Sequence, residues 1–124
     1  MQKLILMMVS IVFGINIYTQ TIEDEILGKW TNPDKSRVIE FVKRGDQYEA
    51  IIRENDEASL IGKSQITHLK YQKDGIYSDG TVHILQQNRT ADCTVRLKTK
   101  NKLLIEASYG FLSKSATWDR VKNK

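Results

Sequence analysis

The most constraining feature of this chain is a series of short stretches rich in β-branched and aromatic residues, with turn signals between them, from residue 28 onward. In residues 47–53, for example, Tyr48, Ala50 and Ile52 fall on one face because side chains alternate along a strand. Turn signals include Pro33-Asp34-Lys35-Ser36, Lys73-Asp74-Gly75 and Asp79-Gly80. The predicted strands are 28–32, 37–43, 47–53, 64–72, 76–78, 81–86, 90–99, 103–109 and 115–121. About eight or nine short strands with frequent turns are typical of an antiparallel sandwich or barrel.

The two tryptophans of the chain favour a closed barrel. Trp30 lies in the first predicted strand, and Trp118 lies in the last one. Tryptophan is usually largely buried in a small domain, so its presence near both ends suggests that the first and last strands close on one core. Closure removes the exposed edges of an antiparallel sheet. Residues 23–27 before the first strand are predicted to form a short helical turn that ends at Gly28.

The N-terminal segment differs from the rest of the chain. Lys3 gives a positive start, residues 4–13 are nearly all apolar, and acidic residues begin only at Glu23. This order is typical of a secretory signal, and the apolar run is shorter than the roughly 20 residues of a membrane-spanning helix. We therefore expect a signal peptide over 1–19, followed by a single domain over 20–124 that is periplasmic or secreted and has no stable membrane insertion. An uncleaved anchor or a buried helix is the alternative interpretation.

The charge distribution limits the kinds of partner, and the cysteine content limits the covalent links, that this chain can have. The formal net charge is +4, and the basic residues are spread along the chain. The densest group, Lys98, Lys100 and Lys102, surrounds a predicted turn without the interleaved aromatic residues of a nucleic-acid site, so no nucleic-acid partner is expected. Cys93 is the only cysteine, which excludes an internal disulfide, and its apolar phase predicts a small buried residue.

The sequence supports no catalytic, metal or cofactor assignment. His68 and His83 lie on predicted strands that could face each other, but a metal site needs three or four convergent ligands, and Glu40 and Asp79 are the only further candidates. Ser, His and Asp occur without a recognised nucleophile motif, phosphate loop or dinucleotide fingerprint. We expect no metal and no enzyme activity, and a catalytic role of His68 or His83 stays open.

Gly28-x-Trp30 after a short helical turn resembles the opening motif of the lipocalins and the wider calycin group. In that group, the tryptophan of the first strand packs beside an arginine of the last strand at the closed end of the barrel. Arg120 occupies the matching place here, where a guanidinium over an indole contributes about 0.5–2 kcal/mol. The resemblance therefore implies that Gly28, Trp30, Trp118 and Arg120 close the barrel.

A more extensive resemblance covers Gly28 to Val121. In this range the chain is similar to the small exported bacterial proteins grouped as domain of unknown function 2147. The shared points are Gly28-x-Trp30, Val38-Ile39-Glu40-Phe41, Gly45-Asp46, residues 113–116 and Trp118-x-Arg120-Val121. The resemblance implies an all-β, lipocalin-like antiparallel barrel of about eight strands with no agreed activity. Residues 84–91 depart from the family pattern.

The barrel interior is the remaining candidate site. Phe41, Tyr48, Ile52 and Tyr109 are the predicted ligand-binding residues, together with Trp30 and one phase of residues 81–97. An eight-stranded barrel is just wide enough to be packed by its own side chains or to hold one small ligand. The short chain favours a small cavity or none, whereas the hydroxyls of Tyr48, Tyr71, Tyr77 and Tyr109 in an apolar lining favour a pocket. The inward phase of the second strand stays open, because both Val38/Val42 and Ile39/Phe41 fit a core.

Three functions are compatible with these features. The leading hypothesis is a barrel that binds a small hydrophobic or amphiphilic ligand in the bacterial envelope or outside the cell. The alternative is a filled barrel that binds an envelope protein or a polysaccharide through its loops, with the polar, irregular residues 54–59 as the first candidate. An enzyme is the third. The ligand and the oligomeric state are left open.

Overall fold

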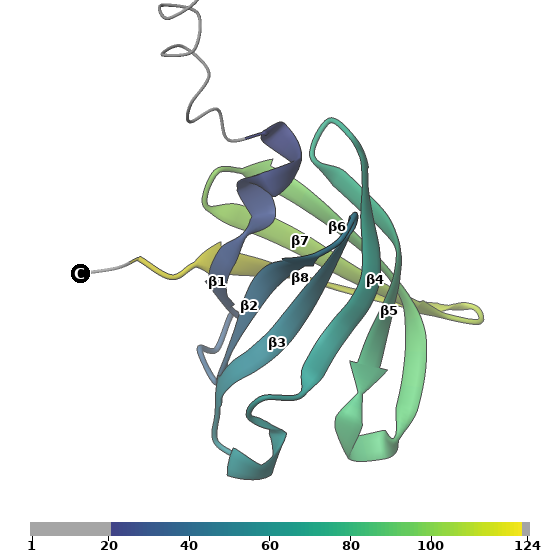
Figure 1. Cartoon of the computed structure of the whole chain (residues 1–124). Helices are drawn as coiled ribbons and strands as arrows, with labels where there is room; N and C mark the ends of the chain where they lie inside the picture. The colour runs from purple at the N-terminus through teal and green to yellow at the C-terminus, as the bar shows by residue number, and fades with distance from the viewer. Residues whose placement is uncertain (1–20, 123–124) are drawn as a thin grey trace, which may run out of the picture.

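The computed structural model describes residues 21–122, which form one closed antiparallel barrel of eight strands (Figure 1). The strands are β1 (Gly28–Thr31), β2 (Arg37–Arg44), β3 (Gln47–Asn55), β4 (Ser64–Lys73), β5 (Ile76–Ile84), β6 (Arg89–Thr99), β7 (Lys102–Tyr109) and β8 (Leu112–Arg120). Three short 3-10 helices accompany them: η1 (Ile22–Ile26), η2 (Ala58–Leu60) and η3 (Leu85–Gln87). The predicted eight-stranded barrel with a helical turn before its first strand is confirmed. The predicted signal peptide, 1–19, lies outside the described residues.

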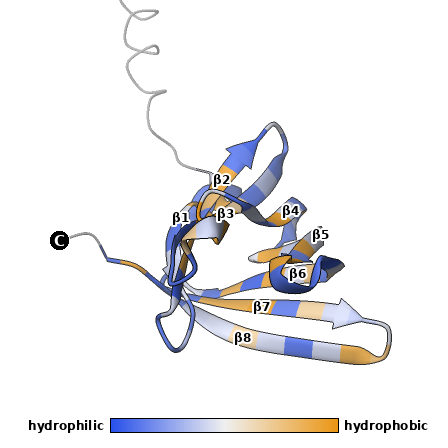
Figure 2. Ribbon diagram, turned by 90° about the horizontal axis from the view of Figure 1, so that it is seen from below, coloured by the Kyte–Doolittle hydropathy of each residue, from blue (hydrophilic) through white to orange (hydrophobic). Residues whose placement is uncertain are grey.

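The barrel closes over a very short seam. β1 pairs with β8 only through Trp30 with Arg120 and Thr31 with Asp119. Among the described strands, the part of β8 before Asp119 is therefore paired with β7 alone. Figure 2 shows the consequence, because β8 runs beside β7 as the outer strand of a long hairpin, while β7 stays paired with β6 on its other side. The short seam leaves the barrel complete at one end and open along β8 at the other.

The prediction of separate strands at 76–78 and 81–86 is wrong, because β5 runs without interruption from Ile76 to Ile84. Asp79 has a φ of 63°, and the register with β6 shifts between Tyr77 and Gly80. The Asp79-Gly80 pair therefore forms an irregular bulge within the strand, where the sequence predicted a turn. A Cβ at Gly80 would lie 2.7 Å from Leu69 Cδ1, so glycine also lets two strands approach closely at this point.

The burial of side chains shows which residues of β2 point into the barrel. Ile39 and Phe41 are fully buried, whereas Glu40 is half-buried and forms an ion pair with Arg53 at 2.8 Å. Cys93 is 2% exposed, as its apolar phase predicted, and burial raises the pKa of its thiol to about 12. The buried cluster consists of Ile26, Trp30, Ile39, Phe41, Tyr48, Ala50, Ile52, Leu60, Ile66, Leu69, Tyr77, Cys93, Val95 and Leu103. Within residues 21–122, no helix has the length and apolar character needed to cross a membrane.

Candidate functional site

One end of the barrel is closed by η1, which lies across it as a plug formed by residues 22–27 (Figure 1). The Trp30 indole N–H donates to the Ile26 carbonyl at 2.9 Å. The Arg120 guanidinium lies 4.3 Å from the centre of the Trp30 ring and donates to the carbonyls of Leu27 and Glu25 at 2.9 and 2.6 Å. The predicted stacking of Arg120 on Trp30 is confirmed.

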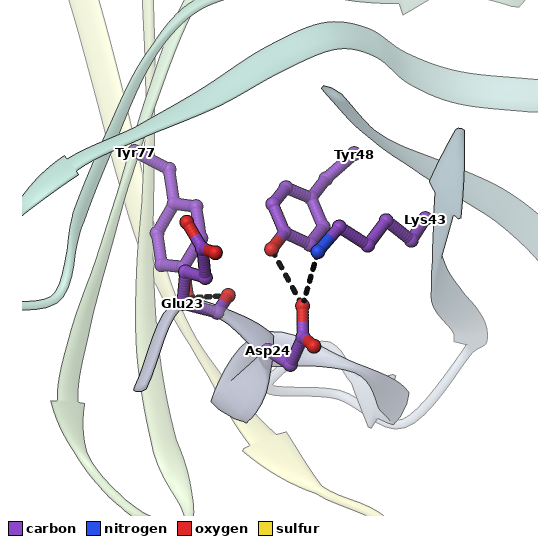
Figure 3. Close-up of polar contacts among 5 residues, drawn as sticks. All are labelled: Glu23, Asp24, Lys43, Tyr48 and Tyr77. Atoms are coloured by element: carbon purple, nitrogen blue, oxygen red, sulfur yellow. Dashed lines mark hydrogen bonds and ion pairs between the residues drawn. The ribbon is translucent and has the colours of Figure 1, made fainter. Parts of the chain in front are cut away.

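Two tyrosines hold the plug from the opposite wall of the barrel (Figure 3). The Tyr77 hydroxyl donates to the Glu23 carbonyl, and the Tyr48 hydroxyl donates to the Asp24 carboxylate, both at 2.7 Å. Lys43 Nζ also lies 3.1 Å from Asp24. The hydrogen bond from Tyr48, together with Lys43, holds the pKa of Asp24 below its usual value of 3.8, while burial raises the pKa of both tyrosines. The phenols are thus neutral donors to the plug.

The other two residues predicted to close the barrel lie near the same end. Gly28 has a φ of 118°, and a Cβ there would lie 3.0 Å from Arg120 Nη1, so both the backbone and the space favour glycine. Trp118 is half-buried against the core and pairs with Leu103 across the β7–β8 ladder. By alternation it shares a face of β8 with Arg120. Its part in closure remains a prediction.

The opposite end of the barrel holds an apolar cleft of about 490 Å³. It is built where β5 ends, η3 follows, β6 begins, β7 ends and β8 begins, on the side of the barrel away from η1. Its lining consists of Val82, Ile84, Gln87, Arg89, Ala91, Ala107, Tyr109, Leu112 and Lys114. We call this site the mouth cleft.

Strand register places the mouth cleft on the inner face of the sheet. Ala91 alternates with the buried Cys93 along β6, and Val82 pairs with Ala91 across β5 and β6. Cys93 pairs with Ala107, which in turn pairs with Lys114 on β8. Residues opposite one another in a ladder share a face, so the cleft continues the surface that forms the core. Its hollow lies over two alanines, because their side chains leave the space that larger residues would fill.

The predicted ligand-binding residues separate into two groups. Phe41, Tyr48 and Ile52 are at most 1% exposed in the core cluster, and none of them lines the mouth cleft. The Tyr48 ring packs edge-on against Tyr77, with ring centres 5.5 Å apart. Tyr109 is 55% exposed and does line the cleft. The first three therefore fill the barrel in this structure, and their ligand contact stays a prediction.

Most residues of the mouth cleft come from segments for which the sequence predicts no individual lining residue. Val82 and Ala91 belong to the one phase of residues 81–97 that the sequence predicts to line the barrel interior. Leu112 lies before the start of the last predicted strand, which the structure extends back to this residue. The signal that could have identified them is the small residue pair Ala91 and Ala107 on apolar phases, but it requires the strand register.

The histidines lie outside the mouth cleft. The Thr67 hydroxyl is 3.0 Å from both His83 Nε2 and His68 Nδ1, so it bridges the two rings. Ser64 donates its hydroxyl to the Glu49 carboxylate. Nothing in residues 21–122 brings three or more His, Cys, Asp or Glu side chains together in an arrangement that could hold a metal ion.

A second large cleft, of about 530 Å³, lies at the plugged end and is lined by Glu25, Leu27, Lys100 and Arg120. Arg120 is already engaged there, since it donates to the carbonyls of Glu25, Leu27 and Lys100 as well as stacking on Trp30. The main polar group of this cleft is therefore already used to close the barrel, and the mouth cleft is the better candidate for binding.

A closed eight-stranded barrel with a helical plug and a Trp–Arg closure at one end is a lipocalin-like fold. Protein HP1028 of the human pathogen Helicobacter pylori, described as belonging to the lipocalin family, shares this fold with a TM-score of 0.64. The two chains are 18% identical, and the match covers 79% of this chain and 84% of the other. The chain belongs to the family described as "Uncharacterized protein conserved in bacteria (DUF2147)", whose model matches residues 28–120. No curated protein matches the sequence.

Proposed function

We propose that this protein is an exported lipocalin-like binding protein that holds a small apolar or amphiphilic molecule in the mouth cleft. One observation carries the proposal: an apolar hollow of about 490 Å³ opens on the inner face of a barrel whose other end is sealed. This volume lies within the roughly 300–1,000 Å³ of typical small-molecule sites. The predicted signal peptide over 1–19 supports export.

The apolar lining gives the driving force for binding. Val82, Ile84 and Leu112 expose apolar surface toward the cleft, and Leu112 remains 69% exposed. Covering such surface with an apolar ligand contributes about 25 cal/mol per Å² before the cost of association. The core below is packed, so the ligand would rest on the core and extend toward solvent.

The experiment pairs two neighbouring substitutions on β7. Ala107→Trp fills the hollow, whereas Ser108→Trp places the same side chain on the outer face one residue later. The mature chain should bind a neutral hydrophobic fluorophore saturably, Ser108→Trp should bind it equally well, and Ala107→Trp should lose at least about tenfold in affinity. Mass spectrometry of an organic extract of the purified protein provides the independent search for a natural ligand. Absence of saturable binding, or equal affinities for the two variants, would contradict the proposal.

The alternative, an interaction module that binds through residues 54–59, has less support. Asn55 accepts a hydrogen bond from Arg37 Nε at 2.9 Å and donates to the Glu57 carbonyl at 3.2 Å. Leu60 of η2 is buried in the core. Asn55 and Leu60 therefore anchor this loop to the barrel, which leaves fewer of its residues available to a partner.

A further inference from the structure

We propose that the mouth cleft selects amphiphiles with an anionic head group, and that Arg89 and Lys114 bind this group. This inference rests on the proposed function and names the class of ligand. The mouth cleft contains two cationic side chains and no acidic one. A carboxylate or phosphate carried on an apolar tail complements that combination of charge and apolar surface.

The two cations have no acidic partner within the described part of the chain. The ion pairs found there involve Lys43, Arg44, Arg53 and Lys102, and neither Arg89 nor Lys114 takes part in them. Each of these four pairs joins the cation to a nearby carboxylate, as Arg53 is joined to Glu40, whereas the lining of the mouth cleft contains no carboxylate. The mouth cleft therefore has an excess of positive charge beside its apolar lining.

The register places the cations at two borders of the hollow. Arg89 begins β6 and pairs with Ile84, so it lies at the outer edge of the cleft on the β5–β6 side. Lys114 pairs with Ala107 and lies on the β8 side. Ala91 follows Arg89 by two residues on β6, and Ala107 lies on β7, between β6 and β8. An apolar body over the alanines would thus have a cation within reach on either side.

Tyr109 fixes one of these cations relative to the cleft. The Arg89 guanidinium lies 5.7 Å from the centre of the Tyr109 ring, and both residues line the cleft. A cation–π contact of this kind orients the guanidinium without using its N–H donors. Those donors stay available for a carboxylate or phosphate, which arginine binds with two parallel hydrogen bonds.

The test compares ligands that share one tail and differ in the head group. Dodecanoate, dodecyl phosphate, dodecanol and dodecyltrimethylammonium each compete with a neutral fluorophore for the mature chain. We expect the anionic ligands to bind at least about tenfold more tightly than dodecanol, and the cationic one to bind most weakly. The order of dodecanoate and dodecyl phosphate shows which head group fits better. The anionic advantage should shrink as NaCl rises from about 0.05 to 0.5 M, because the cations are at the surface.

Matched variants assign the effect to the two residues. Arg89→Gln combined with Lys114→Met should lower the affinity for the anionic ligands about tenfold or more and change the affinity for dodecanol less than about twofold. The control, Arg96→Gln combined with Lys70→Met, removes the same charge from exposed positions that do not line the cleft, and should change neither. Equal binding of dodecanol and dodecanoate would overturn the head-group proposal and leave the proposed function standing. Failure of every ligand to displace the fluorophore would overturn both.

Discussion

The two ends of the barrel contrast in how their side chains are used. At the plugged end, Trp30, Tyr48, Tyr77 and Arg120 each donate a hydrogen bond to a residue of the plug. At the open end, the lining of the mouth cleft is apolar, and its two cations have no acidic partner in the described chain. Of the four tyrosines whose hydroxyls suggest a ligand pocket in the sequence, Tyr48 and Tyr77 therefore hold the plug, whereas Tyr109 lines the mouth cleft. Binding is left to the end that has unused surface.

The largest difference in stability is expected between truncating an aromatic residue at the plugged end and truncating one at the open end. Trp30 is fully buried, so Trp30→Ala should lower the free energy of unfolding by about 3–5 kcal/mol. Tyr109 is 55% exposed, so Tyr109→Ala should lower it by less than about 1 kcal/mol. Urea unfolding followed by circular dichroism measures both. If Trp30→Ala does not fold, Trp30→Phe provides the smaller version of the same loss, and similar stabilities for Trp30→Phe and Tyr109→Ala would contradict the assignment of the two ends.

The next effect concerns the arginine that joins the last strand to the plug. Arg120→Ala removes three hydrogen bonds to carbonyls and the stacking on Trp30, and should cost about 2 kcal/mol given the partial exposure of the side chain. Lys122→Ala, at an exposed position after β8, should change stability by less than about 0.5 kcal/mol. Arg120→Lys should recover only part of the loss, because lysine lacks the planar fork. Equal melting temperatures for Arg120→Ala and Lys122→Ala would refute the closing role of Arg120.

The plugged end was the more predictable of the two from the sequence. Gly28, Trp30 and Arg120 lie at the ends of the folded chain, and strand alternation together with the family resemblance was enough to predict their meeting. The phase of β2 could not be predicted, because Val38 and Ile39 are adjacent and both buried. The register shift between these two residues explains this, since a bulge turns consecutive side chains to the same side.

The structure of the open end depends on strand pairing and register, which no short stretch of the sequence predicts. Asp79-Gly80 has the positive φ expected of a turn, but pairing on both sides converts it into a bulge within β5. The mouth cleft exists because alanines on β6 and β7 come into register next to β8, and because β1 is too short to cover β8. No local pattern predicts either relation. Tyr48 and Tyr109 each lie next to a turn, and the sequence does not show that η1 packs over the first of them while the second stays exposed at the open end.

The pH dependence of stability tests the hydrogen bond by which Tyr48 holds Asp24 of the plug. Tyr48→Phe should cost about 1 kcal/mol at pH 7, since one hydrogen bond to a charged acceptor is lost while Lys43 remains beside Asp24. The pKa of Asp24 is lowered in the folded protein, so its contribution is fully present above its unfolded pKa, near 3.8, and disappears as pH falls through the folded value.

The free energies of unfolding of wild type and Tyr48→Phe should therefore become equal at low pH. Urea unfolding of wild type and Tyr48→Phe between about pH 7 and pH 2 measures the difference, which should decrease below about pH 4. Tyr71→Phe is the matched control, because Tyr71 packs on Tyr77 but forms no described hydrogen bond to the plug. A difference between wild type and Tyr48→Phe that is constant over the whole range would show that the carboxylate does not contribute through this bond.

The smallest effect on stability, and the sharpest on binding, is expected for two neighbours at the turn of the β7–β8 hairpin. Phe111 is fully exposed and does not line the mouth cleft, whereas Leu112 is 69% exposed and does. Phe111→Ser and Leu112→Ser should each change the free energy of unfolding by less than about 0.5 kcal/mol, because neither side chain belongs to the core. Only Leu112→Ser should weaken binding of a neutral hydrophobic fluorophore, by roughly fivefold, which corresponds to about 1 kcal/mol of apolar contact. Fluorescence titration of both variants measures this. A larger loss of affinity for Phe111→Ser than for Leu112→Ser would place the binding surface at the tip of the hairpin and not on the inner face of the barrel. The mouth cleft would then not be the binding site, and the sealed end would contrast with the hairpin tip instead.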